Sequence, residues 1–447
     1  MSSARTPIRY PDVALAPVMT KRAWWLVGLN FVLPGSAQVL AGNRRLGRFG
    51  LGMTLTLIAL AGITLVVYSL WPAVILTVFT NSIGLWVVAL LLAFYGVVWL
   101  ILSLDTLRLV RLVRATPKAR PIIAGLATVL MVGVVGTAGY GAYVATTASG
   151  FLSSVFVAGP TEPPSDGRYN ILLLGGDAGP DREGLRPDSI SVVSIDAETG
   201  KAEIIGLPRD LEDFPFPADS PLAAVYPEGY GAIVGCEVSA CMLNSVFTEV
   251  ELKSPEMYPD AVANGSEPGI EGMRDAAQGI TGLTLQYYVL IDMQGFSELI
   301  DALGGVDITV EDRLPIGGDE ELNNVQDWIE PGAQHMSGYT ALWYARARHG
   351  SSDYDRMERQ RGLQTAILSQ FNPRNVLTKF QAVADASAQV VKTDVPQSML
   401  GYFVNLASKT QALPIGSVEL VPENDVDPSD PDFDYIRELI NTALTPP

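Results

Sequence analysis

Three long apolar runs occupy the first third of the chain. Residues 49–71, 83–104 and 122–146 contain no charged side chain, and each has the roughly 20 residues needed to cross about 30 Å of hydrocarbon. They predict three transmembrane helices. A fourth run, 24–41, is shorter and is interrupted by Pro34-Gly35. We predict a re-entrant or interfacial hairpin there, with a full span as the weaker alternative.

Basic residues indicate which ends of these helices face the cytoplasm. Lys21 and Arg22 precede the fourth run, and a turn with five further basic residues lies between 108 and 120. Positive charge is retained on the cytoplasmic side of membranes. The run 122–146 therefore leads outward, and the chain after about residue 150 is expected outside the cell membrane. Burial of these runs in a soluble core is the disfavoured alternative.

After residue 147 the pattern changes. Residues 148–168 are rich in Ser, Gly and Pro and predict a tether, which separates the membrane region 1–147 from one extracytoplasmic domain, 169–447. Short apolar runs and helical periodicity alternate within that domain, which predicts an α/β layered fold around a central sheet. The predicted strands are 170–176, 189–195, 202–207, 287–291 and 306–310, and the predicted helices are 270–282, 294–303, 337–345, 355–371, 375–389 and 396–408.

Composition and charge exclude several classes of protein. With 48% hydrophobic residues the chain is not disordered throughout, and two cysteines do not make a disulfide-rich scaffold. The net charge of −18 is unevenly distributed. Residues 1–120 carry twelve Lys and Arg against Asp12 and Asp105, a net charge of +10, which leaves −28 on the remainder. Such an acidic domain repels phosphate backbones, so no nucleic-acid partner is expected.

The two cysteines, Cys236 and Cys241, lie five positions apart in a loop-like stretch. Outside the cytoplasm such a pair predicts a local structural disulfide. A zinc site is disfavoured because His335 and His349 are the only histidines of the chain. Redox catalysis favours a closer C-x-x-C spacing.

Arginines and aspartates gather at three junctions between predicted elements. Together they provide what a pyrophosphate with a divalent cation requires, because arginine forks bind phosphoryl oxygens and carboxylates hold a hard cation. The clusters are Asp177 with Asp181-Arg182 and Arg186-Pro-Asp188; Arg209-Asp210; and Arg346-Ala-Arg348 followed by Arg356, Arg359, Gln360 and Arg361.

The third cluster has an ordinary alternative. Arginines on a helix often face water, so residues 355–361 by themselves are equally compatible with a solvated surface. Arg346 and Arg348 are two apart, and on an extended segment they are expected to point the same way. Three clusters at separate junctions of an acidic domain nevertheless favour a common binding site.

The ordered motifs resemble the LytR–CpsA–Psr family over about residues 168–395. They are ILLLGGDAG, RPDSISVVSID, TGKAEIIGLPRD, YYVLIDMQGFSELIDALGGVDI, YARARH and DYDRMERQRGLQ. The resemblance implies an extracytoplasmic α/β/α domain with a mixed sheet, anchored in the membrane and holding a polyprenyl chain in an apolar tunnel. It also implies transfer of a glycopolymer from a polyprenyl-pyrophosphate carrier to peptidoglycan, assisted by Mg²⁺ or Mn²⁺.

The resemblance further assigns roles to individual residues. Asp177 and Asp188 are the expected metal ligands, and Asp177 or Asp210 is the expected acceptor of the hydroxyl proton. The extra pair Asp181-Arg182 is an alternative for the acid or the cation of the first cluster. The expected pyrophosphate-binding residues are Arg186, Arg209, Arg346, Arg348, Arg356, Arg359, Gln360 and Asn244.

Two other functions use the same residues. A polyprenyl-pyrophosphate phosphatase differs only in taking water as the acceptor. A non-catalytic scaffold that binds lipid-linked polymer has less need of metal-ligating acids. The apolar stripe Phe296, Leu299, Ile300 and Leu303 fits a lipid tunnel, but its helical spacing favours ordinary core packing.

Overall fold

The computed structural model describes residues 8–157, 159–177, 186–318, 322–347, 353–370 and 391–445. The chain forms two compact units, residues 1–150 and 151–447. Each has buried apolar clusters of its own.

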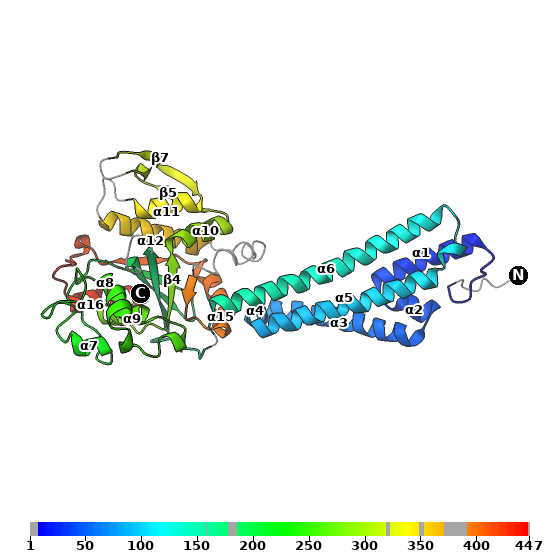
Figure 1. The fold of residues 1–447 in the computed structure, drawn as a ribbon, viewed down its shortest axis with the longest axis horizontal. Helices are drawn as coiled ribbons and strands as arrows, with labels where there is room; N and C mark the ends of the chain where they lie inside the picture. Colours follow the sequence, from blue (N-terminus) through cyan, green and yellow to red (C-terminus); the bar gives the residue numbers. More distant parts are fainter. Residues whose placement is uncertain are drawn as a thin grey trace. The chain divides into compact units, whose positions relative to one another are not determined.

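The three predicted spans are helical (Figure 1). The helices Arg44–Leu70, Ser82–Arg114 and Ala119–Val155 are long and apolar enough to cross a membrane. Most of their apolar side chains are exposed, which fits helices whose outer surface would face lipid. The helices of the first unit are α1 (Ala16–Val32), α2 (Ser36–Ala41), α3 (Arg44–Leu70), α4 (Pro72–Phe79), α5 (Ser82–Val110), η1 (Leu112–Arg114) and α6 (Ala119–Val155).

The run 24–41 forms a hairpin of two helices, α1 and α2. Gly35 has φ +95° at the turn, and a Cβ there would lie 2.4 Å from Leu51 N, so the turn requires glycine. Buried amides hold both arms against α5: Asn30 Nδ2 donates to Ser103 Oγ at 3.2 Å, and Gln38 Nε2 donates to Leu102 O at 2.8 Å. The hairpin is thus packed on the helices; its depth in the membrane stays a prediction.

The first part of the predicted tether is wrong, because α6 continues to Val155. Leu152 and Val155 are buried at 7% exposure. Gln397 Nε2 donates to Leu152 O at 3.1 Å and to Phe156 O at 3.4 Å, which satisfies carbonyls that a helix end leaves open. Local Ser and Gly content was a poor guide here, since partners distant in sequence stabilise the last turn.

The second unit is built on a six-stranded mixed sheet in the order β10-β3-β2-β1-β4-β9. β1 pairs with β4, and β10 with β3, in parallel, while the other neighbours are antiparallel. The strands are β1 (Arg168–Asp177), β2 (Arg186–Asp196), β3 (Ala202–Leu207), β4 (Tyr287–Asp292), β9 (Val391–Thr393) and β10 (Gly416–Glu419).

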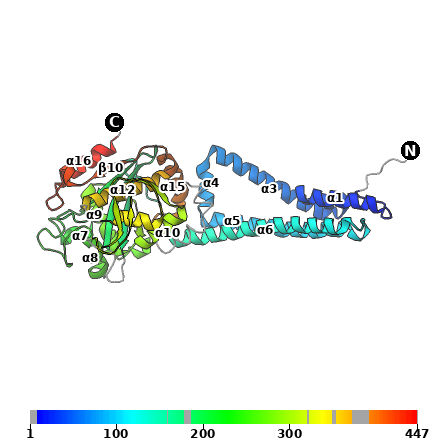
Figure 2. The same ribbon diagram turned by 90° about the horizontal axis from the view of Figure 1, so that it is seen from above.

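Side chains alternate between the two faces of this sheet. Leu172, Val192 and Ile205 point into the larger core with helices α8 (Ser245–Lys253), α9 (Pro268–Thr281) and α16 (Phe433–Leu444). Tyr169 and Tyr287 point the other way, where Phe403 of α15 (Gln397–Thr410) packs on both rings at 5.1 and 5.7 Å between centroids. Helix α12 (Asp353–Gln370) also contacts β3. These are the α/β/α layers expected from the sequence (Figures 1 and 2).

A smaller lobe has its own core, which includes Ile300, Leu314, Met336 and Leu363 (Figure 1). Phe296 packs against this core, so the apolar stripe of α10 serves packing there. The lobe contains α10 (Met293–Leu303), α11 (Gly338–Arg346), β5 (Val306–Val310) paired with β8 (Gly332–Met336), and β6 (Leu314–Gly317) paired with β7 (Val325–Ile329).

The remaining described elements are short: α7 (Pro221–Val225), η2 (Pro255–Met257), η3 (Val262–Asn264) and η4 (Pro422–Asn424). The predicted helix 375–389 lies outside the described residues.

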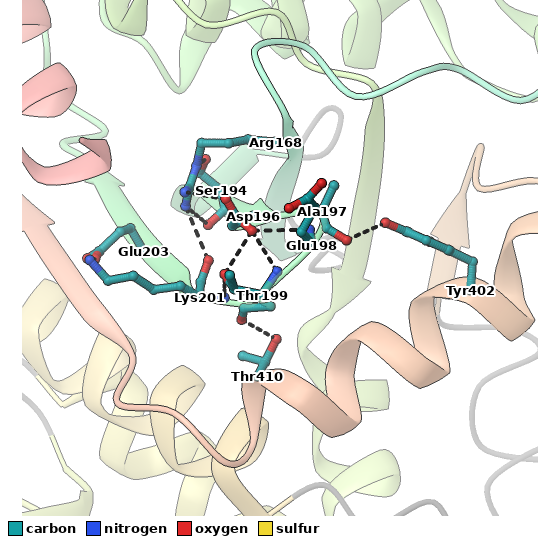
Figure 3. A network of polar contacts seen from close by, with 11 residues as sticks. Arg168, Ser194, Asp196, Ala197, Glu198, Thr199, Lys201, Glu203, Tyr402 and Thr410 are labelled. Atoms are coloured by element: carbon teal, nitrogen blue, oxygen red, sulfur yellow. Dashed lines mark hydrogen bonds and ion pairs between the residues drawn. The ribbon is translucent and has the colours of Figure 1, made fainter. Parts of the chain in front are cut away.

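A polar network closes one end of the sheet, where β1 begins and β2 turns into β3 (Figure 3). Arg168 donates from Nε to Ser194 Oγ at 2.7 Å and from Nη2 to the Ser194 carbonyl at 2.9 Å. Asp196 Oδ1 accepts from the Thr199 N–H and hydroxyl, both at 2.7 Å. Thr410 Oγ1 donates to Gly200 O at 2.7 Å, so α15 fixes the same turn.

Candidate active site

The opposite end of the sheet carries the predicted acids. After a bulge between Gly175 and Gly176, Asp177 pairs with Arg186 across β1 and β2. Asp188 follows two residues further along β2. The register therefore brings the backbones of these three residues to one edge. Asp181 and Arg182 lie outside the described residues, as does the side chain of Asp177.

An ion pair joins the first two predicted clusters. Arg209 Nη1 donates to Asp188 Oδ1 at 2.8 Å, with side-chain exposures of 26% and 14%. Arg209 reaches this position because β3 ends at Leu207 and Pro208 redirects the chain at the sheet edge. Partial burial strengthens the pair relative to a fully solvated one.

Asp210, the next residue in the chain after Arg209, has an unsatisfied acceptor. Its Oδ1 is buried, and no described residue donates a hydrogen bond to it. Buried polar atoms almost always have a partner, so this oxygen marks a position where a ligand group, a proton or water completes the site.

The backbone of Asn244 contacts the same loop. Its N–H donates to the Arg209 carbonyl at 3.0 Å, while the neighbouring Leu243 N–H donates to Leu211 O, also at 3.0 Å. Asn244 precedes α8, but its side chain caps none of the helix N–H groups. The structure thus brings Asn244 next to Arg209 although they are 35 positions apart in the sequence.

A disulfide and a set of buried hydrogen bonds stabilise the long loop from Arg209 to Asn244. Cys236 and Cys241 form a disulfide with a Cα–Cα distance of 5.5 Å. Glu249 of α8 is 4% exposed and accepts from two phenols, Tyr226 and, at 2.6 Å, Tyr230. Burial, followed by the hydrogen bond to Glu249, raises the pKa of both phenols, so they remain donors at neutral pH. The sequence did not predict these hydrogen bonds to Glu249, because a Glu on a helix is usually solvated.

The arginines of α12 do not form a solvated face, so that alternative is wrong for most of them. Arg356 is 2% exposed. Arg359 donates from Nε to the Tyr344 carbonyl at 3.3 Å and from Nη2 to the Ala347 carbonyl, and Gln360 donates to Ala345 O at 3.2 Å. These side chains cap the open carbonyls at the end of α11, and burial lowers the pKa of Arg359. Their expected contact with pyrophosphate stays a prediction.

Arg361 has a partner that sequence reasoning did not find. Its guanidinium binds both carboxylate oxygens of Glu419, at the end of β10, and the side chain is 7% exposed. Burial lowers the pKa of Arg361 to about 10, so it is still charged at neutral pH. A Cβ on Gly206 would lie 2.5 Å from Nη1 of Arg361. The only sequence feature that indicated this close approach is a glycine inside a strand.

α12 and the sheet edge enclose a narrow cavity. Asp188, Gln360 and Arg361 line it together. The first and third predicted clusters therefore meet here, and a residue of the second, Arg209, is bonded to Asp188.

The prediction of an extended segment carrying Arg346 and Arg348 is wrong at Arg346. α11, which begins with Ser337 Oγ accepting the Thr340 N–H at 3.2 Å, continues through Arg346. Arg346 is exposed, and the helix ends at Ala347. Arg348 lies outside the described residues.

Few of the described carboxylates at this edge are placed to hold a metal ion. Within the described ranges no three His, Cys, Asp or Glu side chains gather as a metal site. Mg²⁺ is commonly held by one or two carboxylates, with water and substrate phosphates completing its shell. Asp188 supplies one such carboxylate, and Asp177 as the second ligand stays a prediction.

Comparison with known proteins now assigns the family. The sequence model of the LytR_cpsA_psr family matches residues 153–427, more than half of the chain. The chain belongs to this family. The matched range contains every predicted site residue and the disulfide, and it excludes the three apolar helices apart from the end of α6.

Among curated members of the LytR_cpsA_psr family, the cell wall biosynthesis protein LcpA of Corynebacterium glutamicum is 27% identical over 289 residues, covering 59% of this chain and 51% of LcpA. The polyisoprenyl-teichoic acid–peptidoglycan teichoic acid transferase TagU of Bacillus cereus is 25% identical, covering 52% of this chain and 62% of TagU. The chain thus spans between half and two thirds of the length of these relatives.

Solved structures of similar chains include TagV of B. subtilis, with 19% identity, a TM-score of 0.44, and coverage of 63% of this chain and all of TagV. TagT bound to LIIa-WTA has 18% identity and a TM-score of 0.41, and covers 63% of this chain and 92% of TagT.

Proposed function

We propose that this protein transfers a glycopolymer from a polyprenyl-pyrophosphate carrier to peptidoglycan. The observation that carries the proposal is the Arg209–Asp188 ion pair, together with the unsatisfied Oδ1 of Asp210, the residue that follows Arg209 in the chain. Such a transfer uses two groups. One is a guanidinium that binds phosphoryl oxygens, and the other is a carboxylate oxygen that can accept a proton. The transferase activity named for the relative TagU supports the same reaction class.

In the proposed reaction, a hydroxyl oxygen of a wall sugar attacks the phosphorus that carries the glycopolymer. A new P–O bond forms, the bond from that phosphorus to the bridging oxygen breaks, and polyprenyl monophosphate leaves. Asp210 accepts the hydroxyl proton. Arg186 and Arg209 bind the pyrophosphate oxygens and stabilise the developing charge, assisted by Arg346, Arg348, Arg356, Arg359, Gln360 and Asn244.

Asp177 and Asp188 are the residues that would hold a Mg²⁺ or Mn²⁺ ion. Such an ion neutralises charge on the transferring phosphoryl group when it is bound. Asp188 has a second task, because its Oδ1 orients Arg209.

The proposed location follows from the apolar helices. The first unit crosses the cell membrane several times, the basic turn between α5 and α6 faces the cytoplasm, and the catalytic domain lies outside. Lipid-linked polymer and peptidoglycan are then both within reach of the domain.

The test uses the full chain in lipid nanodiscs with lipid-linked polymer and isolated peptidoglycan. We expect a covalent polymer–peptidoglycan adduct and release of polyprenyl monophosphate that depends on peptidoglycan. Asp177→Ala and Asp188→Ala should lower both signals at least about a hundredfold, whereas Asp430→Ala, an exposed position, should not. Release at full rate without peptidoglycan would make the protein a phosphatase, and binding without release would make it a scaffold.

A further inference from the structure

A groove runs along one side of α1 in the first unit. It has a volume of about 630 Å³ and is lined by Pro17, Thr20, Lys21, Trp24, Trp25 and Thr116. The Thr116 N–H donates to Thr20 Oγ1 at 2.9 Å, which ties α1 to the turn between α5 and α6. The groove therefore lies at the end of the unit that carries the basic turn, and its size is typical of small-ligand sites.

The two basic residues at the start of α1 have different environments. Arg22 is 5% exposed, and its guanidinium donates to the Ile8 carbonyl at 2.7 Å and to the Leu109 carbonyl at 2.5 Å. Lys21 is exposed, and no described residue forms an ion pair or hydrogen bond with it. Arg22 thus holds α1 in place, while the Lys21 ammonium is available to a ligand.

Two indoles lie one turn further along the groove. Trp24 is 40% exposed and Trp25 is 56% exposed. Tryptophan is enriched at the level of lipid head groups, where its ring contacts acyl chains and its N–H reaches polar groups. A cation followed by two exposed indoles therefore matches an amphipathic ligand with an anionic end.

We propose that this groove binds a glycerophospholipid of the cytoplasmic leaflet, with its anionic head group at Lys21 and its acyl chains along Trp24 and Trp25. The inference rests on the membrane orientation proposed above. Charge complementarity selects the occupant: residues 1–120 carry a net charge of +10, and basic pockets beside cytoplasmic helix ends bind anionic head groups. A zwitterionic lipid lacks the net charge that this field attracts.

The test is native mass spectrometry of the full chain released from nanodiscs that contain phosphatidylglycerol and phosphatidylcholine in equal amounts. Wild type should retain phosphatidylglycerol in preference to phosphatidylcholine. Lys21→Gln should reduce retained phosphatidylglycerol about fivefold, and Trp24→Ala should shorten its residence. Lys118→Gln, which removes the same charge from an exposed position on the neighbouring turn but outside the groove, should change retention less than twofold.

Three outcomes would overturn the proposal: equal retention of both lipids, equal losses in Lys21→Gln and Lys118→Gln, or displacement of the lipid by millimolar inorganic phosphate, which would indicate a simple anion site. Labelling of Lys118→Cys with an impermeant thiol reagent in inside-out and right-side-out vesicles reports the orientation separately. Labelling only from the outside would contradict the proposed topology. The lipid-retention measurement could still be interpreted separately.

Discussion

Arginine and aspartate lie at both ends of the part of the sheet formed by β1, β2 and β3, but their contacts differ between the two ends. At the turn end, Arg168 and Asp196 are hydrogen-bonded to backbone and hydroxyl partners (Figure 3). At the other end, Arg209 is bonded to Asp188, and Asp210 keeps a buried oxygen that no described residue satisfies.

The difference shows what distinguishes a site from a structural network of the same composition. Both ends are partly buried and contain the same residue types, so charge and burial alone do not separate them. The two aspartates do differ: Asp196 Oδ1 accepts three hydrogen bonds, whereas the buried Oδ1 of Asp210 accepts none from a described residue and so has room for a ligand. Substitutions at the two ends should therefore affect different measurements.

The largest effect is expected for Asp210→Asn. The amide keeps the volume of the side chain but cannot accept a proton at neutral pH, so transfer should fall about 10²–10⁴-fold. The melting temperature should be unchanged or higher, because a buried carboxylate oxygen without a donor is costly. Adduct formation and thermal unfolding of the full chain measure the two effects. A loss of stability without loss of activity would make Asp210 structural.

Arg209→Lys should come next. Lysine keeps the charge but lacks the planar fork, so transfer should fall about 10²–10³-fold with little change in melting temperature. Arg313→Lys is the matched control, since Arg313 stacks over Trp328 at 4.1 Å and pairs with Glu330 in the smaller lobe. Wild-type activity in both variants would refute the role of Arg209.

The same change at the turn end, Arg168→Lys, should give the opposite result. Lysine cannot reproduce both bonds to Ser194, so the free energy of unfolding should fall by about 1–2 kcal/mol, while transfer at permissive temperature stays at the wild-type level. Denaturation curves and adduct yield on the same preparation test this. Impaired transfer in a fully folded Arg168→Lys protein would show that the turn end also serves activity, which would contradict the proposed difference between the two ends of the sheet.

The smallest effect is expected for Asp196→Asn. Hydrogen bonding, with the Thr199 N–H first among the causes, holds the pKa of Asp196 below its ordinary value of 3.8. A depressed carboxyl pKa stabilises the fold above pH 3.8, and this contribution disappears as the pH falls through the folded-state pKa. At pH 7 the variant should therefore have a lower melting temperature than wild type. Its free energy of unfolding should be lower by less than about 1 kcal/mol, because the group is partly exposed. A difference in melting temperature that does not shrink as the pH is lowered below 3.8 would contradict this.

The sheet was largely predictable because its central strands are short apolar runs with turn signals on both sides. The predicted strand 202–207 and the observed β3 have the same bounds, as do 306–310 and β5. β7 escaped prediction because only one of its five residues is buried and it has no apolar alternation. β9 and β10 have three and four residues, too few for a periodic pattern to register.

The candidate site was predictable as far as strand ends determine it. Asp188 and Arg209 were expected at one edge, and β2–β3 pairing places them there. The Arg361–Glu419 ion pair and the hydrogen bonds from two tyrosines to Glu249 were not predicted, because tertiary packing decides which acid meets which donor. Helix α11 includes Arg346 for a similar reason, since Arg359 and Gln360 stabilise its last carbonyls from another helix.

The parallel pairing of β3 with β10 has a consequence for how the domain is made. β3 ends at Leu207, but its outer edge is covered only when Gly416–Glu419 has been synthesised, about two hundred residues later. At roughly 5–20 residues per second, the nascent chain carries an open strand edge for about 10–40 s. An open edge is a template for pairing with other chains. Synthesis of the segment Gly416–Glu419 therefore decides whether a newly made domain closes its sheet or keeps an edge that can pair with other chains.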